Sequence, residues 1–286
     1  MPSPRPVVLV VAYGHLDLLA EALNGVAGLD VVLVDNARTD ATRELAGTHG
    51  AVYVLPSHNL GFAGGVNLGL QHAPAGRDVL LLNPDAVIDV ESVLRLQRTL
   101  QAAPRLAAAA PRLRRPDGTF EPTRWPLPAP TLPWRGVVGV GSLRPGGASF
   151  LSGAVLLLRR EALDDVGPFD ERFFLYAEEC DWQMRALARG WTCQEDTTVV
   201  AEHVGAGTSS DGSLRDRHFH GSAELLIRKW YGPGGWAVFR AGSLVSALRR
   251  ATTGRTPDQR RLAARAVRLY VRGPARSLTQ DASTSE

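Results

Sequence analysis

The chain has 286 residues, of which 44% are hydrophobic and 21% are charged, and its formal net charge is +3. This size allows one large domain, or one domain with a helical appendage. Its two cysteines, Cys180 and Cys193, form neither a zinc-binding pattern nor a disulfide framework, so a cytoplasmic location is expected. No signal peptide is evident, and no uncharged apolar run reaches the ~20 residues that span a bilayer.

Apolar runs of strand length alternate with amphipathic segments in the first hundred residues. Such alternation predicts a parallel sheet with right-handed crossovers, and therefore an α/β fold. The expected strands are 7–11, 31–34, 51–55 and 79–82, and the expected helices are 16–29, 40–47 and 66–72.

The rest of the chain is less regular. Residues 111–145 are rich in Pro, Arg, Gly and Trp, which favours extended strands and loops. Strands are expected at 150–158 and 197–201, helices at 161–166 and 177–189, and a largely helical region over 219–272 that breaks at 232–235. We therefore expect a first domain over 1–215, a helical region over 216–275, and a disordered tail over 276–286.

Two of the expected strands end in polar residues. Ligands bind outside the carboxyl ends of strands in open α/β sheets. Asp35 and Asn36 could accept hydrogen bonds from a ribose or base, or could form a helix-capping turn. Asn83 and Asp85 offer oxygen atoms that suit Mg²⁺ or Mn²⁺ together with substrate phosphates, although Asp85 could also be a helix N-cap.

A glycine-rich segment, residues 59–67, follows the third expected strand. Its glycines would let the backbone approach a ligand, and the N–H groups of a helix start favour phosphate. A plain glycine turn is the alternative reading.

An acidic and aromatic segment, 169–182, leads into the expected helix at 177–189. Glu178, Glu179 and Asp181 could complement the helix dipole, and Asp181 could pair with Arg185. Alternatively, apolar walls would raise the pKa of one of these carboxyl groups and make it a general base. His203 follows the last expected strand and precedes a Gly- and Ser-containing segment, 204–209.

Taken in order, these motifs resemble the inverting family 2 glycosyltransferases, and most of all their bacterial rhamnosyltransferase-like branch. The resemblance extends over roughly residues 7–210. The motifs that carry it are Val-Ala-Tyr-Gly at 11–14, Val-Asp-Asn at 34–36, Asn-Leu-Gly-Phe-Ala-Gly-Gly-Val-Asn at 59–67, Leu-Leu-Asn-Pro-Asp at 81–85, Phe-Leu-Ser-Gly-Ala at 150–154, the segment 169–182, and His203.

The resemblance implies a GT-A fold, that is, a Rossmann-like, mostly parallel sheet flanked by helices, followed here by a C-terminal helical extension. It implies Mg²⁺ or Mn²⁺ as the cofactor, held by Asp85 and His203. The residues that would contact the nucleotide sugar are Ala12, Tyr13, Asp35, Asn36, Asn59, Gly61, Phe62, Gly64, Asn67, Asn83 and Asp85.

The same resemblance implies a pocket for the sugar and acceptor at Ser152, Gly153 and Trp182. The base would be among Glu178, Glu179 and Asp181, and we favour Glu179 with Asp181 in reserve. Two positions depart from the family pattern, because Asn83 replaces the first of two aspartates and Glu179 replaces the aspartate of a Glu-Asp pair.

The implied reaction is a single inverting, metal-assisted displacement at a nucleotide sugar. The branch favours dTDP-L-rhamnose or another deoxyhexose donor, with UDP- and GDP-sugars open. The acceptor could be a glycan, a polyprenyl-linked sugar or a natural product.

Two other functions remain open. The departures at Asn83 and Glu179 would also suit a non-catalytic nucleotide-sugar-binding or assembly subunit. A nucleotidyltransferase is a further alternative, but residues 12–15 lack the glycine-rich, basic phosphate loop it would place after the first strand.

The C-terminal arginines raise the question of a membrane contact. Apolar residues alternate with Arg240, Arg249 and Arg250 over 236–250, which fits either an interfacial helix or a solvated helix packed on the protein. Nucleic acid is not expected as a partner, because stacking aromatics are not interleaved with these arginines.

Overall fold

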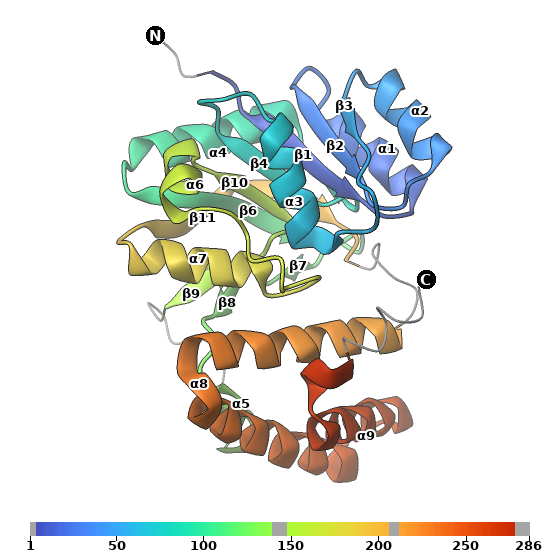
Figure 1. The fold of residues 1–286 in the computed structure, drawn as a ribbon, viewed down its shortest axis with the longest axis vertical. Helices are drawn as coiled ribbons and strands as arrows, with labels where there is room; N and C mark the ends of the chain where they lie inside the picture. Colours follow the sequence, from blue (N-terminus) through green and yellow to red (C-terminus); the bar gives the residue numbers. More distant parts are fainter. Residues whose placement is uncertain (1–3, 139–147, 206–211, 278–286) are drawn as a thin grey trace. The chain divides into compact units, whose positions relative to one another are not determined.

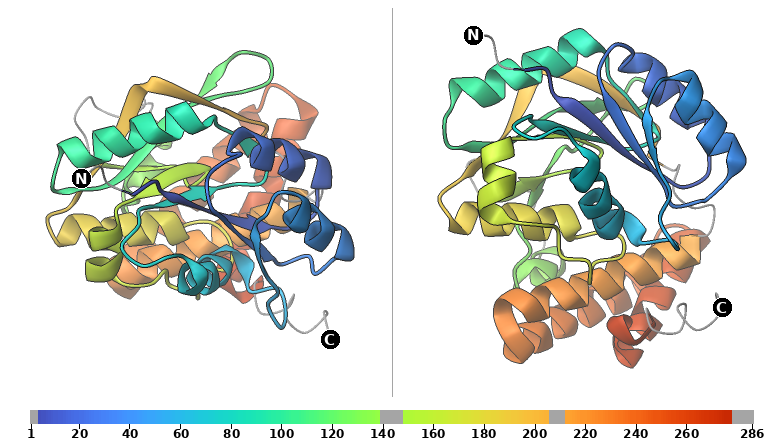
Figure 2. Two further views of the ribbon diagram at one scale, coloured as in Figure 1. Left: turned by 90° about the horizontal axis from the view of Figure 1, so that it is seen from above. Right: turned by 45° about the horizontal axis from the view of Figure 1, so that its top comes forward.

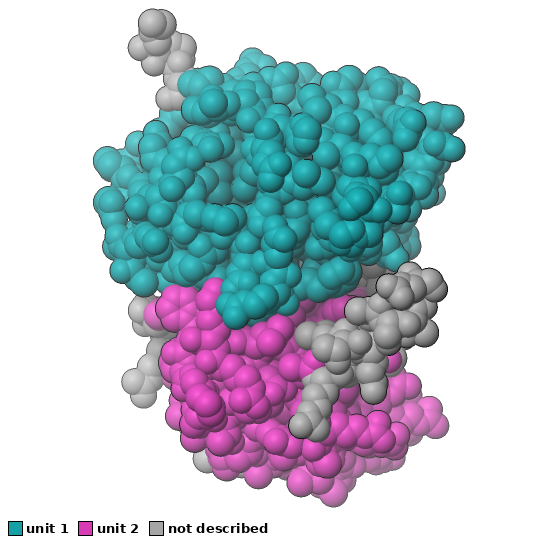
Figure 3. Space-filling model, viewed as in Figure 1, with its two compact units in different colours: residues 1–125, 149–174, 178–210 teal, residues 126–148, 175–177, 211–286 magenta. Residues whose placement is uncertain are grey.

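The computed structural model describes residues 4–138, 148–205 and 212–277. The chain forms two compact units (Figure 3). Unit 1 comprises residues 1–125, 149–174 and 178–210, and unit 2 comprises residues 126–148, 175–177 and 211–286. Residues 126–148, 175–177 and 211–215, which fall inside the predicted first domain, are part of unit 2. The predicted tail, 276–286, begins inside a short 3₁₀ helix and otherwise lies outside the described residues.

Unit 1 is built on a mixed nine-stranded sheet with the order β3-β2-β1-β4-β10-β6-β11-β5, and β7 pairs with β6 (Figure 1). β10 runs antiparallel to its neighbours β4 and β6, whereas β1, β2, β3 and β4 are parallel. A separate two-stranded sheet joins β8 to β9. The strands are β1 (Val7–Ala12), β2 (Val31–Asp35), β3 (Val52–Val54), β4 (Val79–Leu82), β5 (Ala86–Val87), β6 (Leu106–Arg114), β7 (Phe120–Glu121), β8 (Arg124–Pro126), β9 (Ser149–Leu151), β10 (Val155–Leu158) and β11 (Thr192–His203).

Helices cover both faces of this sheet (Figure 2). One apolar cluster joins α1, α2 and α4 to one face, and a second joins α3, α6 and α7 to the other. The α/β class predicted from the sequence is thus confirmed. The helices of unit 1 are α1 (Leu16–Gly25), α2 (Asp40–Thr48), α3 (Gly61–His72), α4 (Val90–Ala102), α6 (Arg160–Val166) and α7 (Glu178–Ala188).

The central strands are apolar throughout because both of their sides face helices. In β1, Val8 and Val10 belong to one cluster while Val7, Leu9 and Val11 belong to the other. A strand that is buried on both faces reads as a continuous apolar run. This explains why the sequence located β1, β2 and β4 correctly.

Most of β6 and all of α4 lie outside the predicted elements. β6 contains four consecutive alanines, Ala107–Ala110, all fully buried, although alanine favours helices. Small side chains and tertiary burial outweigh that preference at the centre of the sheet. Helix α4 was not predicted, and its start is fixed by the Asp89 carboxylate, which accepts a hydrogen bond from the Ser92 N–H at 2.9 Å.

Helix α3 begins at Gly61, five residues earlier than predicted, so the expected glycine loop is mostly helical. The glycines allow the helix to lie close to the sheet. A Cβ at Gly65 would lie 2.6 Å from Val11 Cγ1, and one at Gly69 would lie 2.8 Å from Leu9 Cδ1. At Gly61, φ is +69° and a Cβ would lie 2.2 Å from the Phe174 carbonyl oxygen.

The C-terminal part of unit 2 is helical, as the sequence predicted, but α5 forms a helix within 111–145, where strands and loops were expected. α8 kinks at Gly232, where φ is 66° and Pro233 follows, inside the predicted break. The apolar core of this unit includes Trp236, Phe239 and Tyr270. No helix within the described ranges is long and apolar enough to cross a membrane. The helices are α5 (Leu132–Val138), α8 (Gly212–Thr253), α9 (Pro257–Arg272) and the 3₁₀ helix η1 (Pro274–Ser277).

The close approach at Gly61 leads to a stability prediction. Gly61→Ala and Gly76→Ala both place a methyl group at positive φ, which costs about 1–2 kcal/mol. Only Gly61→Ala also overlaps a neighbour, whereas nothing lies within 4 Å of a Cβ at Gly76. We expect urea unfolding to show a further loss of about 1–3 kcal/mol for Gly61→Ala. Equal losses in the two variants would contradict this packing argument.

Candidate active site

The carboxyl ends of β1, β2 and β4 lie at one edge of the sheet. Ala12 ends β1 directly opposite Asp35, which ends β2. Asn83 and Asp85 follow β4, which pairs in parallel with β1 on its other side. Tyr13 lies just beyond β1 with half of its surface exposed. Three of the sequence motifs therefore meet at the edge where open α/β sheets bind ligands.

Asp35 is fully buried and its carboxylate organises the turn before α2. Oδ1 accepts hydrogen bonds from the Ala37 and Arg38 N–H groups at 3.0 and 2.9 Å. Oδ2 accepts from the Thr39 N–H and from the Tyr53 hydroxyl, both at 2.9 Å. Asp35 therefore shapes the turn before α2, while the helix itself is capped by Thr39, whose side chain accepts a hydrogen bond from the Thr42 N–H.

Asn36 and Asn59 hold the start of α3. The Asn36 Nδ2 donates to the Gly61 carbonyl at 2.8 Å, and the Gly61 N–H donates to Asn59 Oδ1 at 2.9 Å. The Phe62 N–H donates to the Phe174 carbonyl at 2.7 Å. Protein acceptors thus occupy two of the N–H groups at this helix start.

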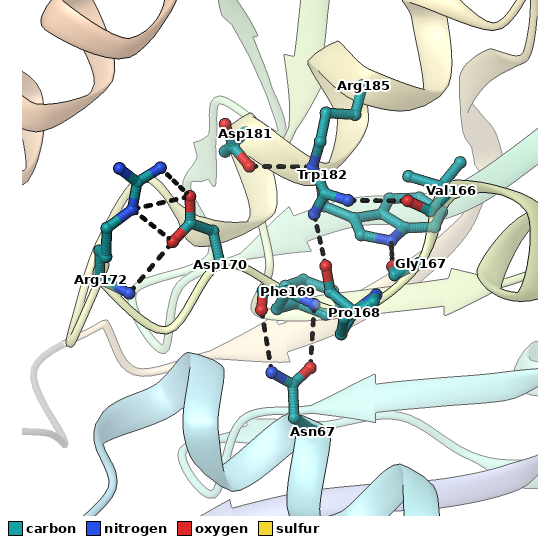
Figure 4. A network of polar contacts seen from close by, with 10 residues as sticks. All are labelled: Asn67, Val166, Gly167, Pro168, Phe169, Asp170, Arg172, Asp181, Trp182 and Arg185. Carbon is teal, nitrogen blue, oxygen red and sulfur yellow. Dashed lines mark hydrogen bonds and ion pairs between the residues drawn. The ribbon is translucent and has the colours of Figure 1, made fainter.

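Asn67 fastens α3 to the loop that precedes α7 (Figure 4). Its amide accepts a hydrogen bond from the Phe169 N–H and donates one to the Phe169 carbonyl, both at 2.9 Å. Trp182, from α7, donates to the Gly167 carbonyl at 3.0 Å and stacks on the Phe169 ring. Trp182 is fully buried in the core, so it does not line the acceptor pocket where the sequence analysis expected it.

Asp181 is tied into the same network through Arg185 (Figure 4). Arg185 Nε donates to Asp181 Oδ2 at 3.0 Å, so the predicted pair is present. The other guanidinium nitrogens donate to the carbonyls of Val166 and Pro168 at 2.8 and 2.7 Å. Asp181 is completely buried. It therefore orients an arginine that holds the loop, which favours Glu179 over Asp181 as the base.

Glu178 and Glu179 form the first turn of α7, next to an unusual backbone segment. Tyr176 and Ala177, which precede them, have φ values of 67° and 72°. Consecutive non-glycine residues in this left-handed region are rare and cost about 1–2 kcal/mol each. Such strain persists only where the surrounding structure imposes it, and it occurs often at functional sites.

The pKa values of the two glutamates are raised. Burial, together with the charge of Glu179, raises the pKa of Glu178 well above its ordinary value. Burial also raises the pKa of Glu179, although backbone hydrogen bonds, including one from Gly153, partly oppose it. Among the described residues, the Oε2 atoms of both glutamates are buried without a hydrogen-bond partner. A carboxyl group in this state is suited to exchange a proton with a ligand.

Ser152 and Gly153 lie in the short connection between β9 and β10, and Gly153 faces Glu179. A Cβ built on Gly153 would lie 3.5 Å from the Glu179 side chain. The Ser152 N–H donates to the Thr123 carbonyl at 2.8 Å. Of the predicted pocket residues, the structure thus brings Gly153 next to Glu179, whereas the Trp182 side chain is buried in the core.

Asp85 and His203 come together although 118 positions separate them in the sequence. β5 pairs antiparallel with β11, and His203 lies opposite Ala86 in that ladder. His203 Nε2 is 3.5 Å from Asp85 Oδ1, and His203 Nδ1 is hydrogen-bonded to Glu121 Oε1. Burial lowers the pKa of His203, but the carboxylates of Asp85 and Glu121 outweigh this effect and raise it. No sequence motif had pointed to Glu121.

The donor atoms of Asp85 and His203 fit a divalent cation. Two ligands at about 2.1 Å from one ion lie about 3 Å apart when they are at right angles, close to the observed separation. No cluster of three or more His, Cys, Asp or Glu side chains suited to a metal occurs within the described ranges. A cation here would thus need further ligands, as Mg²⁺ obtains from water and substrate phosphates. The Gly- and Ser-containing segment after His203 lies mostly outside the described residues.

The mixed sheet, its polar carboxyl edge and the helices on both faces are those of a GT-A fold. The chain belongs to glycosyl transferase family 2, whose family model matches residues 7–167, more than half of its length. The resemblance to family 2 seen in the sequence is thereby confirmed.

Curated relatives and solved structures agree with this assignment. An N-acetylglucosaminyl-diphospho-decaprenol L-rhamnosyltransferase from Mycobacterium tuberculosis is 29% identical over 82% of this chain and 87% of its own. Galactofuranosyltransferase GlfT1 from Mycolicibacterium smegmatis is 30% identical over 64% of this chain and 65% of its own. A mannosyltransferase from Pyrobaculum calidifontis, solved with GDP-Man and Mn²⁺, shares the fold at a TM-score of 0.56 and 19% identity, covering 98% of this chain and 84% of that one.

The raised pKa of Glu178 predicts a pH-dependent stability effect. Its folded pKa exceeds the unfolded value of about 4.3, so stability falls as pH rises from there through the folded pKa. Glu178→Gln removes this titration, so the melting temperature of the variant relative to the wild type should increase as the pH rises above about 4.3.

The matched control is Glu44→Gln, because Glu44 is exposed on α2. Its melting temperature relative to the wild type should stay constant over the same pH range. A constant difference for Glu178→Gln as well would show that burial of Glu178 does not oppose its ionisation.

Proposed function

We propose that this protein is an inverting glycosyltransferase in which Glu179 is the general base. The observation that supports this best is the Glu179 carboxyl group, whose pKa burial raises and whose Oε2 is buried without a hydrogen-bond partner in the described structure. Catalytic bases work best when their pKa lies near the working pH. Asp181 is engaged with Arg185 instead.

The proposed reaction is a single displacement. The acceptor hydroxyl oxygen forms a bond to the anomeric carbon on the face opposite the nucleoside diphosphate, while Glu179 takes the hydroxyl proton. The bond from the anomeric carbon to the diphosphate oxygen breaks, its electron pair leaves with the diphosphate, and the configuration inverts. Mg²⁺ or Mn²⁺ held by Asp85 and His203 would neutralise the charge of the departing diphosphate.

The proposed donor is dTDP-L-rhamnose, with UDP- and GDP-sugars as alternatives. The support is the similarity to the mycobacterial rhamnosyltransferase over most of both chains. Tyr13 is exposed at the carboxyl edge and available to a nucleoside. Asp35 would have to exchange one existing bond, such as that from Tyr53, to contact the nucleoside directly. Asn36, Asn59 and Asn67 would act through the backbone segments they hold.

The proposed acceptor is a polyprenyl-diphosphate-linked sugar. The name of the mycobacterial relative describes such an acceptor, an N-acetylglucosaminyl-diphospho-decaprenol. A glycan or natural-product hydroxyl would undergo the same displacement, because Glu179 needs only a proton to remove.

The base assignment can be tested by Glu179→Gln, assayed with dTDP-L-rhamnose, Mn²⁺ and a polyprenyl-diphosphate-linked N-acetylglucosamine. We expect the rate to fall by about 10²–10⁴ because the amide cannot accept the proton, with donor binding retained. Glu44→Gln is again the control. Near-normal turnover of Glu179→Gln would show that Glu179 is not the base. If the wild type bound the donor without any transfer or hydrolysis, the non-catalytic subunit would be favoured instead.

We also propose that the helices of unit 2 contact an anionic membrane surface. Arg261, Arg265, Arg268 and Arg272 follow one another at helical spacing on α9, and all are exposed. Leu262 and Val271 on the same helix are more than half exposed. A basic helix with exposed apolar side chains has the composition of an interfacial helix.

If α9 contacts the membrane, neutralising two of its arginines should weaken binding to anionic vesicles by a calculable factor. Each basic residue near an anionic surface contributes about 1 kcal/mol, so Arg265→Gln with Arg268→Gln should weaken binding to phosphatidylserine vesicles by about 30-fold. Arg95→Gln with Arg98→Gln, on exposed positions of α4, makes the same charge change elsewhere. Equal losses in both double variants, measured by co-sedimentation, would leave no role for α9.

A further inference from the structure

The His203 imidazole lies between two carboxylates from different parts of the chain. Nε2 faces Asp85 Oδ1 at 3.5 Å, and Nδ1 is hydrogen-bonded to Glu121 Oε1. All three side chains are largely shielded, with 14% of His203, 4% of Asp85 and 13% of Glu121 exposed. Low exposure limits the number of orientations that the ring can adopt.

Backbone pairing fixes the place of Glu121. β7 pairs antiparallel with β6, which sets Glu121 opposite Leu113. Its second oxygen, Oε2, is 3.3 Å from Arg115 Nη2. β6 also pairs in parallel with β11, which ends at His203. Both carboxylate oxygens of Glu121 thus have partners. The pairing of β7 and β11 with β6 places Glu121 beside the imidazole.

The hydrogen bond at Nδ1 has a consequence for the other ring nitrogen. A neutral imidazole carries one N–H and one lone pair. Because a carboxylate oxygen only accepts hydrogen bonds, the contact with Glu121 places the proton on Nδ1. In the neutral imidazole the lone pair then lies on Nε2, the nitrogen that faces Asp85. Histidines that bind metals commonly donate their second N–H to a carboxylate in this manner.

We propose that Glu121 is a positioning residue that fixes the His203 tautomer, so that Nε2 presents its lone pair to a divalent cation at Asp85. This inference rests on the cation site proposed above. The competing account is that Glu121 only fastens β7 to the sheet. That account predicts a loss of stability without a change of tautomer or of metal affinity.

Two measurements on the full chain separate these accounts. In the first, the protein is titrated with Mn²⁺ alone, and the free ion is followed by electron paramagnetic resonance. In the second, the ring nitrogens of His203 are observed by ¹⁵N NMR, and His203→Gln identifies their signals. Glu121→Ala should weaken Mn²⁺ binding by about 10–100-fold and shift the proton from Nδ1 toward Nε2. Glu121→Gln keeps an accepting oxygen and should recover most of the affinity and the original tautomer.

The matched control is Glu202→Ala. Glu202 precedes His203, is largely exposed and pairs with Arg114 at 2.7 Å, so its removal deletes the same charge nearby without touching the imidazole. It should leave the tautomer and Mn²⁺ affinity unchanged. Equal losses for Glu202→Ala and Glu121→Ala would overturn the proposal in favour of a general charge effect.

The failure of this inference can be told apart from failure of the cation site. If His203→Gln and Asp85→Asn weaken Mn²⁺ binding but Glu121→Ala does not, the positioning role is wrong and the cation site stands. If neither Asp85→Asn nor His203→Gln changes Mn²⁺ affinity, the cation site itself is wrong. An unchanged tautomer in folded Glu121→Ala overturns the positioning role in either case.

Discussion

Burial of the central strands on both faces is the constraint on which the site depends. β1 and β4 are apolar from end to end, and β2 is apolar up to its last residue, because helices cover each side of the sheet. Polar side chains can therefore occur only where these strands end. Parallel pairing brings those ends to one edge, so Asp35, Asn83 and Asp85 are gathered by the same apolar packing that stabilises the fold.

At the start of α7, carboxyl groups that are close in sequence have different partners and therefore different roles. Asp181 is buried but neutralised by Arg185, whose remaining donors hold two loop carbonyls. Glu179 is two positions earlier and lacks such a partner among the described residues, so burial raises its pKa. Removing a charge from water without compensation favours the protonated form. One helix turn thus contains a structural carboxylate and a candidate base.

The sequence predicted the position of an element correctly where a single local pattern determines it. Continuous apolar runs located β1, β2 and β4, and the Gly-Pro break in α8 was correct. The sequence did not identify most of β6, where burial overrides the helix preference of alanine, and it placed the start of α3 too late, because the α3 glycines serve packing. The contact of Glu121 with His203 depends on strand pairings between distant segments, β6 with β7 and β6 with β11, which no local pattern encodes. The family resemblance suggested Asp85 and His203 jointly, but the ladder between β5 and β11 that joins them was visible only in the structure.

The glycines of α3 also affect how the protein folds. Gly64, Gly65 and Gly69 are interior helix positions, and each lowers intrinsic helix stability by about 1 kcal/mol relative to alanine. Such a helix has little tendency to form in isolation and gains its stability from docking on β1 and β2. We therefore expect α3 to consolidate after the folding transition state, once the strands that receive it are in place. The segment that bears Asn59, Gly61 and Asn67 would then be the last part of this edge to become ordered.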